Sequence, residues 1–126
     1  MHTIGLKKQC KAKHFLPDQK GKENDIHSHK YTIEVIFSGE KINKKGYLLD
    51  INELNKILEK IFEKFENNIL NELPEFRNIN PTLENFSKIL WRLIGKELET
   101  ENISTLKVKI HESEDAYASY GGKLQD

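Results

Sequence analysis

The sequence has little of what marks secreted, membrane or nucleic-acid-binding proteins. Cys10 is the one cysteine among 126 residues, which excludes an intrachain disulfide and is typical of a reducing cytoplasm. No apolar run is long enough to cross a bilayer, and Met1-His2-Thr3 does not resemble the start of a signal peptide. Twenty basic and twenty acidic residues give a formal net charge of zero, which removes any general electrostatic case for nucleic acid or an anionic membrane as partner. We expect one cytoplasmic domain spanning residues 1–126.

Two stretches near the N-terminus alternate between apolar and polar residues, as half-buried strands do. In the first, residues 3–13, the even positions are apolar except at Lys8, and His14 continues this parity. A polar loop over residues 16–25 follows. The second strand starts at His27 and ends near residues 38–39. One of its faces carries His27, His29, Tyr31, Ile33, Val35 and Phe37.

The middle of the chain has the periodicity of two amphipathic helices. Asp50 is the expected N-cap of the first, whose apolar residues are Leu54, Ile57, Leu58, Ile61, Phe62 and Phe65, and residues 67–68 are its expected end. Residues 71–80 are predicted to be irregular. Thr82 is the expected N-cap of the second, whose apolar residues are Leu83, Phe86, Ile89, Leu90, Leu93, Ile94 and Leu98.

Residues 104–113 predict a third strand and residues 116–120 a short fourth. In the third strand Leu106, Val108 and Ile110 share a face, and Glu112 continues it. The element order is therefore ββααββ. It predicts an α+β fold in which two helices lie on one face of an antiparallel four-stranded sheet.

Polar groups occupy the otherwise apolar face where the strands end: His14, His27 and His29, and then Glu112. A buried carboxylate needs a partner. Three histidines without an obvious fourth ligand match an open catalytic zinc site better than a closed structural one, and the single cysteine also argues against a thiolate site. Two simpler interpretations stay open: the histidines are hydrogen-bonded core residues of a plain β-rich domain, and Glu112 is half of a structural ion pair.

Five segments in order resemble a known family: 10–17 (CKAKHFLP), 27–29 (HSH), 46–50 (GYLLD), 81–85 (PTLEN) and 110–113 (IHES). They are similar to the 6-pyruvoyl-tetrahydropterin synthases and the 6-carboxy-tetrahydropterin synthases of queuosine biosynthesis. The resemblance covers nearly the whole chain. It implies the tunnelling fold, with the same ββααββ order, and subunits joined edge to edge into a barrel, typically a homohexamer made of two trimers.

The resemblance also implies roles for individual residues. His14, His27 and His29 match the family's zinc ligands. Glu112 matches the acidic residue that clamps the pterin ring, and Thr82 lies in the segment that lines this pocket. Zinc would bind the side-chain hydroxyls of dihydroneopterin triphosphate and stabilise the negative charge that develops there.

Four positions depart from the family's pattern. Glu23 stands where the family usually has a cysteine that acts as general base or acid, four residues before the first histidine of the pair. Glu66 and Asn67 stand where it has an Asp-His pair that assists proton transfer, and asparagine cannot carry a proton at neutral pH. Ser28 replaces a glycine, which a strand accepts.

Two explanations of these departures stay open. One subgroup of the family uses a glutamate in place of the cysteine, cleaving the side chain to leave 6-hydroxymethyl-dihydropterin for folate synthesis; Glu23 would then be the base of a carbon-carbon or carbon-oxygen lyase. Alternatively, the chain is a non-catalytic homologue that binds zinc and a pterin-like ring. Because the family's active sites lie between subunits, Glu66 is a further candidate that would act on a neighbour's site.

Overall fold

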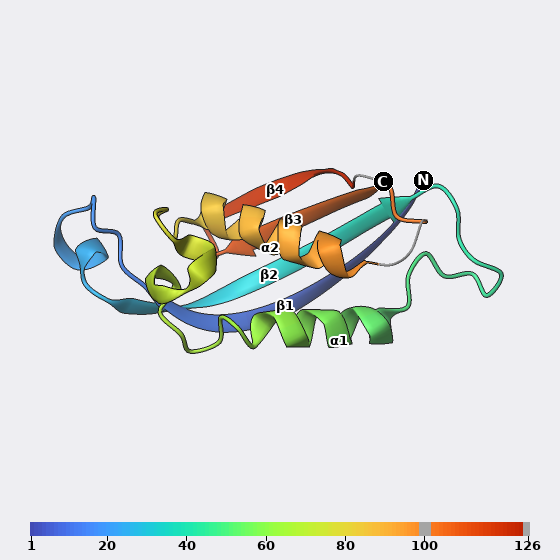
Figure 1. Cartoon of the computed structure of the whole chain (residues 1–126). Coiled ribbons are helices and arrows are strands. Elements are labelled where there is room, and N and C mark those ends of the chain that lie inside the picture. The colour runs from blue at the N-terminus through green and yellow to red at the C-terminus, as the bar shows by residue number, and fades with distance from the viewer. Residues whose placement is uncertain (99–101, 125–126) are drawn as a thin grey trace.

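The computed structural model describes residues 1–98 and 102–124 and has two layers, a twisted antiparallel sheet and two helices on one of its faces (Figure 1). The strands are β1 (His2–His14), β2 (His27–Gly39), β3 (Thr105–His111) and β4 (Tyr117–Lys123), and the helices are α1 (Ile51–Phe62) and α2 (Leu83–Glu97). The sheet order is β1-β2-β3-β4. The predicted α+β fold and element order are confirmed.

The alternation in the sequence decides which face of the sheet the helices cover. Exposure alternates along β2, where Tyr31, Ile33, Val35 and Phe37 are at most 1% exposed and their even-numbered neighbours are more accessible. Strand register places these residues opposite the even residues of β1 and of β3. The apolar faces of three strands thus form one continuous surface, and burying it beneath the helices is the main stabilising contribution to the fold.

Both helices begin where the sequence predicts. The side chain of Asp50 accepts a hydrogen bond from the backbone N–H of Asn52, and that of Thr82 accepts one from the N–H of Asn85. These caps satisfy N–H groups that the first turn of a helix leaves without partners. The second cap also fixes the start of α2 beside the ends of β1 and β2, where the histidines lie.

Several details differ from the sequence prediction, among them the end of β3, which lies at His111 instead of residue 113. Helix α1 ends at Phe62 instead of continuing to residues 67–68, because the chain turns after it and Asn67 adopts a positive φ of 59°. The stretch expected to be irregular contains two 3₁₀ turns, Leu70–Glu72 and Pro74–Phe76, and a third, Gly21–Asn24, lies in the first loop. Strand β4 extends to Lys123, three residues beyond its predicted end.

Segments between the two helices hold the C-terminal end of β1. The backbone N–H of Lys13 donates to the carbonyl of Asn68, and the N–H of Asn67 donates to that of Lys11. Asn71 exchanges two hydrogen bonds, of 3.0 and 2.9 Å, with the backbone of Phe15. The end of β1 that carries His14 is therefore fixed on both sides. None of the helices in the described part of the chain is long and apolar enough to span a membrane.

Candidate metal centre

Strand pairing brings the three predicted histidines together. His14 is paired directly with His27, and His29 is paired with Ala12, two residues before His14. Because alternate residues of a strand share a face, all three imidazoles project from the helix-covered face. Their ring centroids are 4.5 Å (His14–His27), 4.9 Å (His14–His29) and 4.7 Å (His27–His29) apart.

The nitrogen atoms of this cluster are arranged as metal ligands are. One ring nitrogen of each histidine lies within 4.8 Å of the others, and the Nε2 atoms of all three are buried without a hydrogen-bond partner. A buried polar atom without a partner is costly. Three such atoms converging on one point are explained by an ion that the imidazoles would share. The residues present therefore fit a metal ion.

Backbone carbonyls hold two of the rings through their other nitrogen. His14 Nδ1 donates to the carbonyl of Pro81 at 2.9 Å, and His27 Nδ1 donates to that of Asp25 at 2.7 Å. A proton on Nδ1 leaves the lone pair on Nε2, which is the tautomer a metal requires, and such contacts are usual around metal-binding histidines. The Tyr31 hydroxyl also lies 3.3 Å from His14 Nδ1.

Burial favours the neutral form of His14. Its side chain is 4% exposed, and burial lowers the pKa of its imidazole, while the carbonyl of Pro81 opposes the shift and the neighbouring His27 and His29 add to it. A neutral imidazole is the form that donates a lone pair to a metal. His14 is thus available as a ligand at pH values where an exposed histidine is partly protonated.

Two carboxylates border the cluster. Glu112 Oε1 is 2.7 Å from His29 Nε2, although not in the direction of a hydrogen bond, and its side chain is 29% exposed. Glu23 Oε2 is 3.6 Å from His27 Nε2, and its side chain is 51% exposed. Glu112 follows β3 directly, while Glu23 lies in the 3₁₀ turn of the first loop. Two of the three acidic candidates from the sequence, Glu112 and Glu23, therefore lie beside the histidines.

The remaining two candidates lie in different places. Thr82 caps α2 and directly follows Pro81, the residue that holds His14. Glu66 is apart from the cluster: its Oε2 accepts from the N–H of Lys11, at 3.1 Å, and Lys11 precedes His14 by three residues, or about 10 Å along a strand. Within one chain Glu66 does not join the site, so its role stays a prediction about a neighbouring copy.

Three contributors to the site were not singled out from the sequence, and only one of them has a sequence signal. The carbonyls of Asp25 and Pro81 are backbone atoms, which any residue type supplies. Tyr31 shares its face with the histidines, and parity alone could have marked it as a neighbour, since its ring lies 5.5 Å from that of His29.

Comparison with solved structures identifies the fold. The fold superposes on the 6-pyruvoyl tetrahydropterin synthase of Caenorhabditis elegans, with a TM-score of 0.86 over 97% of this chain and 96% of the other, at 20% identity. It also superposes on a Plasmodium vivax 6-pyruvoyltetrahydropterin synthase, a catalytic-residue mutant in which Glu is replaced by Cys (TM-score 0.76, 15% identity, covering 98% and 100%). The chain thus has the tunnelling fold of pterin synthases.

Sequence comparison identifies the family. The family model "6-pyruvoyl tetrahydropterin synthase" matches residues 3–123. A putative 6-carboxy-5,6,7,8-tetrahydropterin synthase of Archaeoglobus fulgidus is 32% identical over 115 residues, 91% of each chain. A dihydroneopterin monophosphate aldolase of Pyrococcus furiosus is 31% identical over 74 residues, 59% of this chain and 60% of its own. The chain belongs to the 6-pyruvoyl tetrahydropterin synthase family.

Proposed function

We propose that this chain is a zinc-dependent lyase that acts on the side chain of 7,8-dihydroneopterin triphosphate. The observation that carries the proposal is the convergence of three unpartnered histidine nitrogens between two carboxylates. His14, His27 and His29 would hold the zinc ion. When bound, zinc acts as a Lewis acid that stabilises negative charge on the substrate's side-chain oxygens.

Glu112 is suited to orient the pterin ring. A carboxylate accepts two parallel hydrogen bonds, and the ring offers its 2-amino group and the adjacent ring N–H as paired donors. In the structure this carboxylate lies against His29 Nε2, which is also the atom that would bind the metal. Thr82, at the start of α2, would line the same pocket.

Glu23 is the proposed general base. It lies 3.6 Å from His27 Nε2, close enough to receive a proton from a hydroxyl bound between the histidines. Cys10 cannot take this role, because it is 1% exposed and burial raises the pKa of its thiol to about 12, assisted by Glu66. The Plasmodium vivax protein provides a precedent for a catalytic glutamate in this fold.

The product we propose is 6-hydroxymethyl-dihydropterin, formed by cleavage of the side chain, and the partial likeness to a dihydroneopterin monophosphate aldolase supports cleavage. The likeness to a 6-carboxy-tetrahydropterin synthase supports queuosine biosynthesis as the other pathway. A second candidate function is a non-catalytic binder of zinc and a pterin. The feature in its favour is Asn67, which stands where the family's proton-transferring histidine is expected.

Product analysis separates these possibilities. Purified, zinc-loaded protein is incubated with dihydroneopterin triphosphate, and the pterins are identified by chromatography and mass spectrometry. We expect 6-hydroxymethyl-dihydropterin from the wild type and a loss of about 10²–10⁴-fold in turnover in Glu23→Gln, with zinc content unchanged. Pterin binding without turnover, abolished by Glu112→Ala, would instead identify the binder. Absence of stoichiometric zinc in natively purified protein would refute the metal site itself.

We also propose that the chain assembles into an edge-to-edge barrel, as a homohexamer. Strands β1 and β4 are the two edge strands of the four-stranded sheet, and each can pair with a strand of another copy. Assembly would bring further side chains to the site, Glu66 among them. Native mass spectrometry measures the subunit number directly, and a monomer at micromolar concentration would contradict the proposal.

A further inference from the structure

The face of the sheet opposite the helices is strongly basic. It carries the outward residues of all four strands, and seven of these are lysines: Lys7, Lys11, Lys13, Lys30, Lys107, Lys109 and Lys123. Glu34, which is paired with Lys7 and Lys109, is the acidic strand residue on this face. Since the whole chain has a formal net charge of zero, the positive charge is concentrated on this surface.

These lysines are not neutralised by the protein. Across residues 1–98 and 102–124 none of the seven forms an ion pair; the lysines that do are Lys8, Lys60 and Lys64. Lys109 Nζ lies 4.1 Å from the centre of the exposed Tyr117 ring instead. Neighbouring like charges repel one another, so an anion placed between them gains attraction and also relieves that repulsion.

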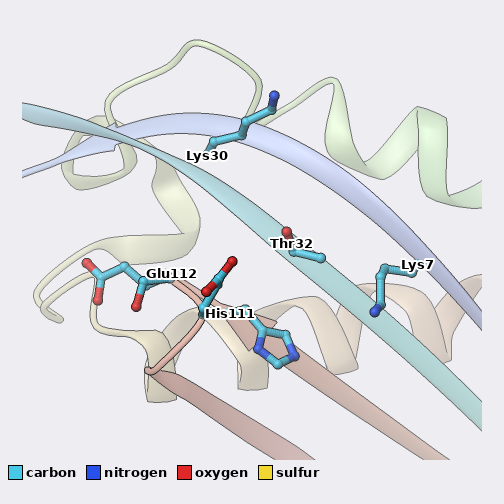
Figure 2. Close-up of a pocket in the computed structure, with 7 residues that line it drawn as sticks. Lys7, Lys30, Thr32, His111 and Glu112 are labelled. Carbon is cyan, nitrogen blue, oxygen red and sulfur yellow. The ribbon is translucent and has the colours of Figure 1, made fainter.

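A pocket of about 270 Å³ opens on this face, where the N-terminal part of β2 lies beside the C-terminal end of β3. Figure 2 shows Lys7, Lys30, Thr32, His111 and Glu112 around it, and Ser113 and Glu114 complete its lining. Thr32 and His111 are directly paired across the two strands, and Lys30 precedes Thr32 by two residues on the same face. Two lysines, two hydroxyl-bearing residues and a histidine are thus among the seven residues that line one small space.

In the described part of the chain, the acidic residues at the pocket form no ion pair with its two lysines. The Glu112 carboxylate contacts His29, and Glu114 is exposed beyond the end of β3. Glu34 lies opposite Lys7 in the register but forms no ion pair with it in the described part of the chain. The volume admits a small anion and is too small for a nucleic-acid helix.

We propose that this pocket binds a short phosphate chain. Lys7 and Lys30 would neutralise its charge, and Thr32 and His111 would donate hydrogen bonds to its oxygens. The bound phosphate chain has two potential sources, a free inorganic polyphosphate and the phosphate tail of the substrate. Only the second source rests on the proposed function. The pocket lies on the opposite face of the sheet from the histidine cluster, and Glu112 borders both.

Calorimetric titration with inorganic tripolyphosphate at low ionic strength tests the site, and it needs no turnover. We expect Lys7→Gln and Lys30→Gln each to weaken binding about tenfold, the usual effect of losing one charged hydrogen bond. Lys56→Gln is the matched control, because Lys56 is an exposed lysine on α1. Higher salt should weaken binding of the wild type.

Kinetics with active protein distinguish the two sources. If the substrate's tail occupies the pocket, both variants raise KM for dihydroneopterin triphosphate and leave KM for dihydroneopterin unchanged. If a free polyphosphate occupies it, both KM values stay unchanged while tripolyphosphate binding is lost. No binding by the wild type, equal binding by all four proteins, or a clear preference for duplex nucleic acid would overturn the proposal.

Discussion

Metal binding by the three histidines should raise the thermal stability of the protein by a predictable amount. A ligand that binds only the folded state at 100 times its dissociation constant adds about 2.7 kcal/mol to the free energy of unfolding. For a chain of 126 residues, 1 kcal/mol corresponds to about 4 °C in Tm. Zinc at that concentration should therefore raise Tm by about 10 °C.

The variant His27→Ala tests whether the cluster is responsible. The side chain of His27 is 24% exposed, and its one hydrogen bond is to the carbonyl of the exposed Asp25. Its loss should cost about 1 kcal/mol without metal, or about 4 °C, and should remove the zinc-dependent increase. His2→Ala, at the opposite end of β1, should keep that increase in full.

Differential scanning fluorimetry at constant protein concentration, with and without zinc, measures all three proteins. An equal zinc-dependent increase in His27→Ala and wild type would refute the assignment of this histidine as a ligand. An increase lost equally in His2→Ala would show that zinc acts elsewhere. Metal analysis of the same samples should give one zinc per chain for wild type and His2→Ala.

Three further predictions concern other parts of the chain. Burial raises the pKa of the Cys10 thiol from 9.0 to about 12, so the thiol loses its proton at lower pH in the unfolded chain than in the folded one. Denaturant titrations should therefore show the free energy of unfolding falling by up to about 1.4 kcal/mol per pH unit above pH 9. A free energy of unfolding that stays constant above pH 9 would contradict the burial argument. A thiol reagent at pH 8 should label Cys10 only after denaturation, and rapid labelling of native protein would show that this part of β1 opens. Thr82→Ala should lower the free energy of unfolding by about 1 kcal/mol in a urea titration, because Thr82 Oγ1 accepts a 3.1 Å hydrogen bond from the N–H of Asn85. Thr82→Ser should keep most of the wild-type stability. Equal stability of the two variants would show that the cap contributes nothing.

Parity was the informative signal in the sequence. Because side chains alternate along a strand, His14 could be assigned to the same face as Cys10 and Ala12, and His27 to the same face as Tyr31. The register that pairs His14 with His27 depends on the length of the intervening loop and on the twist of the sheet. That pairing is a property of the fold and could not be derived from either segment alone.

The sequence was less informative where backbone hydrogen bonds or a reversal of the chain determine the end of an element or the contacts of a side chain. The end of α1 is an example: Phe65 continues the helical spacing and is buried, yet the helix stops at Phe62. Glu66 shows the same limit for contacts: its carboxylate accepts a hydrogen bond from the backbone of Lys11, while its proposed role in a neighbouring copy stays a prediction. Neither outcome follows from residue type.

The hydrogen bonds that hold the C-terminal end of β1 also restrict how copies of this chain can associate. The carbonyl of Lys11 and the N–H of Lys13, on the outer side of β1, are already paired with residues 67 and 68. Outward peptide groups of an edge strand recur at every second residue, so those that remain belong to Thr3, Gly5, Lys7 and Gln9. In the proposed assembly, a strand from another copy would therefore meet an edge about half as long as β1. The paired peptide groups at the histidine end of β1 would limit the register of that strand.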